Sequence, residues 1–184
     1  MTYGTRTDHY PWTSKLLHWL IAACVLTTAP VAIAMGRVAP GPTQDSLYNL
    51  HKSLGVLIFV LMVLRLINRL TAGAPMADPR IEAWQKAASS GVHTLLYVLL
   101  VAMPIVGYVA NSAYGAPTPF FGLFTLPPIV GKNEALSDQL FMLHRWTGWF
   151  LILLVLMHIS AALFHHFRGD NVLKRMLPRA MGGF

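Results

Sequence analysis

The feature that most constrains this chain is a long apolar segment near its C-terminal end, Leu140–His166, which carries His144 and His158. On an α-helix, the fourteen residues between these histidines correspond to about 21 Å of rise and about 1400° of rotation, within ~40° of whole turns. Both imidazoles are therefore expected on one face, near opposite sides of a bilayer. Ligating side chains are costly inside an apolar span, so we expect both to have a function. Such a helix can hold two metal centres stacked across a membrane, with the opposite ligands supplied by the rest of the chain.

The composition indicates an integral membrane protein. Of the 184 residues, 55% are hydrophobic and only 11% are charged, whereas about a quarter of the residues in soluble domains are charged. Cys24 is the only cysteine, which excludes an internal disulfide, a cysteine-based zinc site and an iron–sulfur cluster. The net charge of +7 could suggest nucleic acid as a partner, but its distribution follows membrane topology instead, so no nucleic-acid binding is expected.

Four apolar runs are long enough to cross a hydrocarbon core of ~30 Å. We therefore predict an all-α membrane protein in which residues 1–184 form one domain, a four-transmembrane-helix bundle. The expected spans are approximately 14–36, 50–70, 90–112 and 139–166. The sequence Ala32-Ile33-Ala34 resembles a signal-peptidase site, so a cleaved signal is the alternative for the first run. The length of that run and the His18-Trp19 pair at its start favour a span.

The segments between these runs are predicted loops because they are polar or rich in proline and glycine. They are Arg37–Asn49, Thr71–Lys86 and Asn111–Gln139. The third is the longest, and its mixture of phenylalanine, proline and glycine predicts a cap lying in the membrane interface.

The distribution of Lys and Arg predicts the orientation, because short cytoplasmic loops are enriched in both. Ten of the fourteen cations lie in the terminal tails or around the second-to-third connector. They are Arg6, Lys15, Arg65, Arg69, Arg80, Lys86, Arg168, Lys174, Arg175 and Arg179. The opposite side has Arg37, Lys52, Lys132 and Arg145. We therefore expect a multi-pass protein of the bacterial inner membrane with both termini in the cytoplasm.

Alternating spans also fix the depth of four histidines. His18 and His158 are expected near the inner surface, and His51 and His144 near the outer one. Residues at the same depth form a pair, and the two members of each pair come from different helices. A bundle-core cofactor site requires this arrangement. The alternative for any one of them is a hydrogen bond to a neighbouring helix.

The two histidines of each pair are too few for a closed zinc site, which takes four ligands, but they match the two axial positions of a haem iron. No Cys-x-x-Cys-His motif is present, so a non-covalent b-type haem is expected at each pair. Gly55, Gly107 and Gly148 could allow a macrocycle to approach the backbone, or could serve helix packing.

Several segments resemble the bacterial cytochrome b561 family over nearly the whole chain. They are Lys15–Trp19, Asn49–Gly55, Leu95–Tyr97, Met103–Gly107, His144-Arg145, His158–His166 and Asp170–Arg179. The resemblance implies a four-helix, quinone-linked protein with two b haems, whose iron ligands are His18, His51, His144 and His158. Within the family the chain is most similar to the superoxide oxidase type, which implies electron transfer from superoxide to ubiquinone.

Histidines near the inner surface are candidates for a quinone site. His165 lies two turns from His158 on the same face, and His93 begins the third span at that level, so either could hydrogen-bond a quinone carbonyl and relay protons. His166 is a weaker candidate, and solvated contact with lipid headgroups is the alternative for the His165-His166 pair. Further lining candidates are Lys15, Trp19 and Tyr97.

Both outer histidines are followed by a cation, Lys52 after His51 and Arg145 after His144. A local cationic mouth can raise the on-rate of a small anion such as superoxide, so we assign Lys52 and Arg145 to the superoxide site. Neutralising haem propionates, or reaching lipid headgroups, are the alternatives.

Three functions remain open from the sequence. The first is a superoxide:ubiquinone oxidoreductase, and the second is an electron-transfer cytochrome b subunit linking a periplasmic dehydrogenase or hydrogenase to the quinone pool. The third is a haem-free transporter or structural protein. A protein redox partner is expected only for the second.

Overall fold

A computed structural model describes residues 10–73, 75–76 and 80–178. Arg6 and Arg179, two of the cations behind the predicted orientation, lie outside these residues. Within them, four long helices follow one another: α1 (Trp12–Met35), α2 (Pro42–Ala72), α3 (Ala83–Tyr114) and α4 (Glu134–Phe167). All four are long and apolar enough to cross a membrane, which confirms the predicted all-α membrane bundle.

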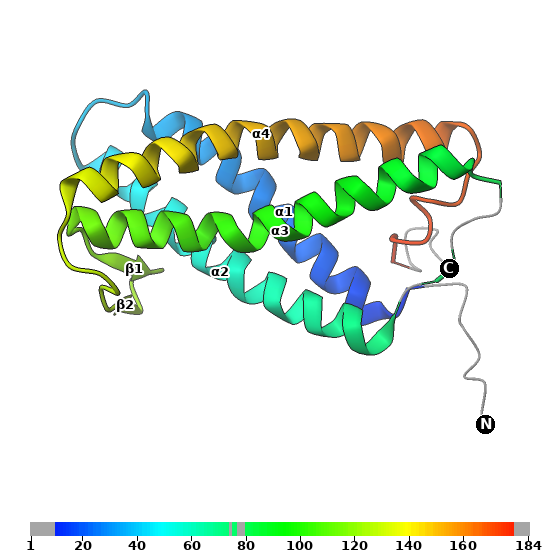
Figure 1. Ribbon diagram of the computed structural model, residues 1–184, viewed down its shortest axis with the longest axis horizontal. Helices are drawn as coiled ribbons and strands as arrows, with labels where there is room; N and C mark the ends of the chain where they lie inside the picture. Colours follow the sequence, from blue (N-terminus) through cyan, green and yellow to red (C-terminus); the bar gives the residue numbers. More distant parts are fainter. Residues whose placement is uncertain (1–9, 74, 77–79, 179–184) are drawn as a thin grey trace.

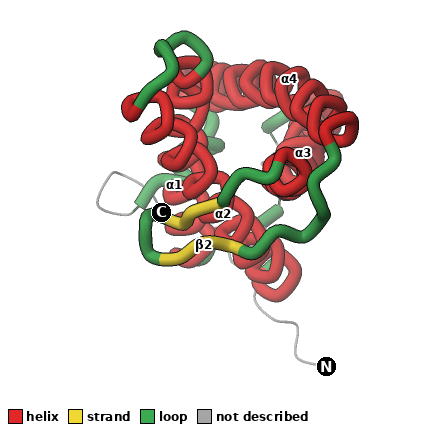
Figure 2. Tube along the Cα trace, turned by 90° about the vertical axis from the view of Figure 1, so that its left-hand side faces the viewer, coloured by secondary structure: helices red, strands yellow, loops and turns green. Residues whose placement is uncertain are grey.

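Successive helices run in opposite directions along the bundle (Figure 1). The closest packing joins α1 to α2, α3 to α4 and α2 to α3, and the end-on view shows the four helices arranged around a common axis (Figure 2). The start of α1 and the end of α4 lie at the same end as the α2–α3 connection, which we call the terminal end. The opposite end is called the hairpin end.

The buried apolar cluster is small and lies on the α1–α2 side. It consists of Ile21, Ile58 and Met62, with Tyr97 and Leu100 of α3 packed against it. Many large apolar side chains of all four helices are instead exposed, as expected for helices whose outer faces contact lipid rather than water.

The prediction of a loop over Arg37–Asn49 is wrong from Pro42 onward, because α2 begins there. Proline is well tolerated at the first helical position, where its missing N–H would have had no partner. Gly41 precedes it with φ 150°, and Asp45 adds a favourable negative charge to the first turn. The polar composition that suggested a loop therefore belongs to a helix start.

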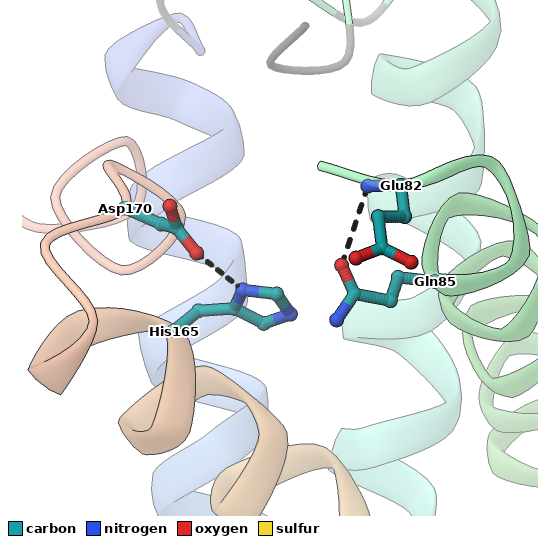
Figure 3. Close-up of polar contacts among 4 residues, drawn as sticks. All are labelled: Glu82, Gln85, His165 and Asp170. Atoms are coloured by element: carbon teal, nitrogen blue, oxygen red, sulfur yellow. Dashed lines mark hydrogen bonds and ion pairs between the residues drawn. The ribbon is translucent and has the colours of Figure 1, made fainter. Parts of the chain in front are cut away.

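The predicted connector Thr71–Lys86 is also shorter than expected, because α3 begins at Ala83. A capping box starts this helix: Glu82 accepts from the backbone of Gln85, and the Glu82 N–H donates to Gln85 Oε1 at 3.3 Å (Figure 3). Reciprocal capping of this kind satisfies two N–H groups that a helix start leaves free. At its other end, α3 terminates on Gly115 in the left-handed conformation.

The predicted cap between the last two spans contains a β-hairpin that the sequence did not reveal. Strands β1 (Thr118–Phe120) and β2 (Phe124–Leu126) pair antiparallel, with Phe120 opposite Phe124. Their turn includes Phe121 at φ 49° and Gly122 at φ 74°. Such a short pair is marginal by itself, so its stability depends on how it is anchored.

Buried polar side chains supply the anchors. Ser53 of α2 accepts from the Phe121 N–H at 2.9 Å, and it lies within reach of the Asn49 and Pro119 carbonyls. Asn111 of α3 donates to the Ala116 carbonyl at 2.8 Å and to Thr118 Oγ1 at 2.8 Å. The hairpin is therefore fixed to both helices beneath it.

The predicted basic tail after α4 folds back over the terminal end. Residues 170–178, which we call the strap, cross to the start of α1. There Lys15 donates to the Leu177 carbonyl at 2.9 Å and Trp19 to the Met176 carbonyl at 2.8 Å. The strap therefore joins α4 to α1 through side chains.

We predict that Ser53→Ala destabilises the hairpin. The change removes the acceptor of the Phe121 N–H, and the loss of a typical intramolecular hydrogen bond costs about 0.5–1.5 kcal/mol. Thermal unfolding in detergent and amide hydrogen exchange at Phe121 would measure the effect. Ser46→Ala is the matched control, because this exposed hydroxyl bonds, among the residues described, only to Pro42 of its own helix; equal effects of the two changes would contradict the anchor.

Candidate functional site

At the hairpin end, one histidine pair faces across the bundle. His51 comes from α2 and His144 from α4, and their ring centroids are 6.1 Å apart with the rings nearly perpendicular, at 83°. The sequence paired these residues by depth, and the structure brings them together.

A second pair lies toward the terminal end. His18 of α1 and His158 of α4 have ring centroids 6.2 Å apart, with an angle of 73° between the rings. His93 of α3 is a third imidazole in this group, 5.2 Å from His158. His93 Nδ1 also lies 2.7 Å from the Ser89 carbonyl. A carbonyl can only accept, so Nδ1 is the donor in this contact, and in the neutral ring the lone pair is on Nε2.

The spacing within each facing pair suits a metal between the rings. With metal–nitrogen bonds of about 2.0–2.1 Å, two imidazoles on opposite sides of one metal have centroids about 6.4 Å apart. The two facing pairs, at 6.1 and 6.2 Å, come close to this value. The His93–His158 distance of 5.2 Å is shorter than such a sandwich requires.

Unsatisfied polar atoms mark the hairpin-end pair. Nδ1 of His51 and Nδ1 of His144 are both buried, and neither makes a hydrogen bond of good geometry with a described group, although the backbone of Thr28 lies near the first ring and that of Met103 near the second. A buried polar atom without a partner costs about 1–3 kcal/mol. Burying the two rings as packing residues alone is therefore costly, and a group bound between them would engage one nitrogen of each ring.

Gly107 of α3 makes room for one of these rings. A Cβ at this position would lie 2.9 Å from His144 Cε1 and 3.2 Å from Nδ1, too close for any other residue without moving the ring. Gly148 would meet only Met103 at 3.6 Å, and Gly55 nothing within 4 Å. Of the three glycines singled out in the sequence, Gly107 is thus the one that directly shapes a histidine site.

The two cations beside the outer histidines have different environments. Lys52 is half-buried and donates to the Pro117 carbonyl at 2.8 Å, which ties it to the hairpin, whereas Arg145 is exposed. The contact between Lys52 and the hairpin was not predictable, because it joins residues 65 positions apart.

At the terminal end, His165 of α4 pairs with an acidic residue of the strap. Its Nδ1 lies 2.7 Å from Asp170 Oδ2, and both side chains are largely shielded, at 15% and 18% exposure. The neighbouring His166 has a buried Nδ1 without a partner among the described groups. The sequence singled out His165 but missed Asp170, although a carboxylate five residues after a histidine that ends a helix was a usable signal.

The weaker lining candidates lie around the same end. Lys15 and Trp19 hold the strap. The Arg65 guanidinium lies over the Tyr97 ring, 5.8 Å from its centroid. Each therefore has a structural contact of its own.

The fold and the facing histidines define a class: a membrane-spanning helical bundle able to hold metal-centred cofactors between its helices. Comparison with known proteins agrees, because residues 9–179 match the family described as "Prokaryotic cytochrome b561". The chain belongs to this family.

Three relatives are similar over most of their length. Cytochrome b561 homolog 2 of Escherichia coli (strain K12) is 31% identical over 189 residues, covering 100% of this chain and 99% of the relative. Cytochrome b561 homolog 1 of the same organism is 33% identical, covering 94% and 98%. A protein of Yersinia pestis named "Probable superoxide oxidase CybB" is 30% identical, covering 90% and 94%.

Membership of this family makes the chain a multi-pass bacterial membrane protein of electron transport that carries b-type haem. The residues present fit that group: facing imidazoles at metal-sandwich spacing, orphaned ring nitrogens and a glycine against one ring.

We predict that Gly107→Ala lowers haem content or alters the spectrum of one haem, because the new methyl group displaces the His144 ring. Haem quantification and absorbance spectra of the purified protein would measure this. Gly91→Ala is the control in the same helix, since a Cβ there meets nothing within 4 Å. Identical haem content and spectra in both variants would contradict the assignment.

Proposed function

We propose that the chain carries two b haems, one held by His51 and His144 and the other by His18 and His158. The observation that carries this proposal is the spacing of the two facing pairs, 6.1 and 6.2 Å, at two different depths of one bundle. Both pairs share α4, so one helix sets the separation between them.

We further propose that the protein oxidises superoxide to oxygen at the hairpin end and reduces ubiquinone at the terminal end. A haem with two imidazole ligands supplies one-electron transfer at its edge and offers no open position for binding oxygen. The similarity to the Yersinia pestis protein named as a probable superoxide oxidase supports this activity.

At the hairpin end, the chain's contribution is access and charge. Arg145 is exposed one residue from His144, and Lys52 follows His51. A fixed local positive charge raises the encounter rate of a small anion. The Lys52 contact with Pro117 keeps this cation beside the hairpin, so both cations can guide superoxide toward the edge of the bundle.

At the terminal end, the chain's contribution is hydrogen bonding to the quinone. His165 presents a ring whose Nδ1 is already engaged by Asp170, leaving Nε2 for a quinone oxygen. His93 lies beside His158 at the same end and is the second candidate contact. With the excess of Lys and Arg at this end, we assign it to the cytoplasm and the hairpin end to the periplasm.

A second function is favoured by the hairpin surface. Phe121, Leu123 and Phe124 at its tip are 46%, 76% and 57% exposed, on a segment held rigidly by Ser53 and Asn111. A rigid apolar surface next to the hairpin-end histidines would suit docking of a periplasmic dehydrogenase or hydrogenase. In that case the chain is an electron-transfer subunit, and it should copurify with its partner.

We predict that His51→Ala and His144→Ala each remove the same haem and spare the other, because each removes one ligand of one pair. The double variant should lose no more haem than either single one. Haem-to-protein ratios and redox difference spectra would test this. Two haems with normal spectra in either single variant would contradict the pairing.

We predict that Arg145→Glu lowers the second-order rate constant for superoxide, because it replaces a cation that attracts the anion by a carboxylate that repels it. The variant should also show a weaker salt dependence of this rate. In the original chain, added salt screens the attraction, because the Debye length falls from ~30 Å at 0.01 M to ~10 Å at 0.1 M salt. Stopped-flow haem reduction would measure the rates. Lys132→Glu, which makes the same charge change at the same end, should have the smaller effect. Equal effects of the two changes, or rates independent of salt, would argue against local steering and favour the subunit.

The whole reaction can be tested with the isolated chain. Purified protein in vesicles should reduce ubiquinone when superoxide is generated, and no partner protein should be needed. Reduction of the haems only by an added dehydrogenase or hydrogenase would support the second function instead.

A further inference from the structure

The His165–Asp170 pair is built by a local turn of the chain. Gly169 takes φ 83°, a left-handed conformation that glycine adopts without strain. The chain then reverses, and the Asp170 N–H donates to the carbonyl of His165 itself at 2.9 Å. The carboxylate is thereby returned to the ring of the same residue, where Oδ2 lies 2.7 Å from Nδ1.

Contacts further along the strap hold this turn in place. Beyond the anchors at Lys15 and Trp19, Arg175 donates to the Met76 carbonyl at 2.6 Å, which connects the strap to the α2–α3 connection. The strap is thus attached to α1 and to that connection, in addition to α4. Asp170 is held at one position relative to the His165 ring rather than swinging freely in solvent.

This contact decides which nitrogen of His165 can exchange protons. An ionised carboxylate can only accept, so Nδ1 must carry the hydrogen, and in the neutral ring the lone pair then resides on Nε2. Figure 3 shows the second ring nitrogen directed away from Asp170, toward the α3 side where Gln85 lies. Nε2 therefore faces the start of α3, where Gln85 lies, and not the strap.

We propose that Asp170 is a positioning residue for proton delivery to the quinone by His165. The inference rests on the proposed function and extends it. Quinone reduction consumes two electrons, supplied by the reduced haems, and two protons. Each time His165 is protonated at Nε2, it donates that proton to a quinone oxygen as the N–H bond breaks and the O–H bond forms. The ring is then reprotonated at Nε2 from water, while the Nδ1 hydrogen stays on His165 and is donated to Asp170 throughout.

Asp170→Asn tests the proposal, because it keeps the size of the side chain but replaces a carboxylate, which can only accept a hydrogen bond, by an amide. An amide can also donate to Nδ1, which moves the ring hydrogen to Nε2. With haem-loaded protein and a short-chain ubiquinone, we expect kcat for quinone reduction to fall about ten-fold or more while KM stays within about three-fold. Asp170→Glu should recover part of the rate, and superoxide should reduce the haems at the same rate in all variants.

The tautomer gives a readout that does not depend on turnover. The protein would be labelled with ¹⁵N-histidine, and the His165 signal would be assigned by its loss in His165→Gln. In the original chain, the neutral His165 ring should be protonated at Nδ1. In Asp170→Asn, it should be protonated at Nε2, or exchange between the two nitrogens. Asp138→Asn, a change of the same kind at an exposed residue of α4, should alter neither the rate nor the tautomer.

A double-variant cycle separates positioning from a general structural effect. If Asp170 acts through His165, adding Asp170→Asn to His165→Gln should slow the reaction no further. An additive loss, a purely KM effect, or a wild-type tautomer in Asp170→Asn would overturn the proposal. If the unmodified chain failed to reduce quinone at all, the proposed function would be wrong, and the tautomer measurement would still test the positioning of His165.

Discussion

An imidazole inside the hydrocarbon region has to find a partner, because neither lipid nor water satisfies its nitrogens there. Four histidines of this chain face that constraint, and the fold places them in two facing pairs whose ring centroids lie 6.1 and 6.2 Å apart. The apolar helices do not close tightly around them: the buried cluster of Ile21, Ile58 and Met62 is small and lies between α1 and α2. The bundle is therefore best understood as a frame whose centre is completed by the cofactor that family membership implies.

The two ends of the frame are closed by polar contacts rather than by apolar packing. At one end, Ser53 and Asn111 anchor a hairpin at the end of the bundle that holds the His51–His144 pair. At the other, the strap joins α4 to α1, two helices at opposite ends of the chain, and delivers Asp170 to His165. At the hairpin end, the hairpin is the cover, and a cation suits the proposed anionic electron donor. At the terminal end, the strap is the cover, and a shielded histidine suits the proposed quinone.

Periodicity and hydropathy predicted the four spans and, through depth alone, which histidines would meet, because both properties follow from the geometry of alternating straight helices. Periodicity and hydropathy do not predict the contacts that are made by segments folding back onto the bundle. The Ser53 hydroxyl meets a turn 68 positions away, and no local pattern encodes that distance. The sequence around Pro42 predicts a loop although Pro42 begins a helix, since proline is compatible with both. Asp170 was missed because its role depends on a reversal at Gly169.

The central claim is that each facing pair holds one haem iron with both axial positions filled. Haem quantification against protein concentration, combined with low-temperature electron paramagnetic resonance of the oxidised protein, tests it most directly. The account predicts two b haems per chain, both six-coordinate and low-spin, as two imidazole ligands require. One haem per chain, or a high-spin signal from an iron with an open position in the intact protein, would contradict it.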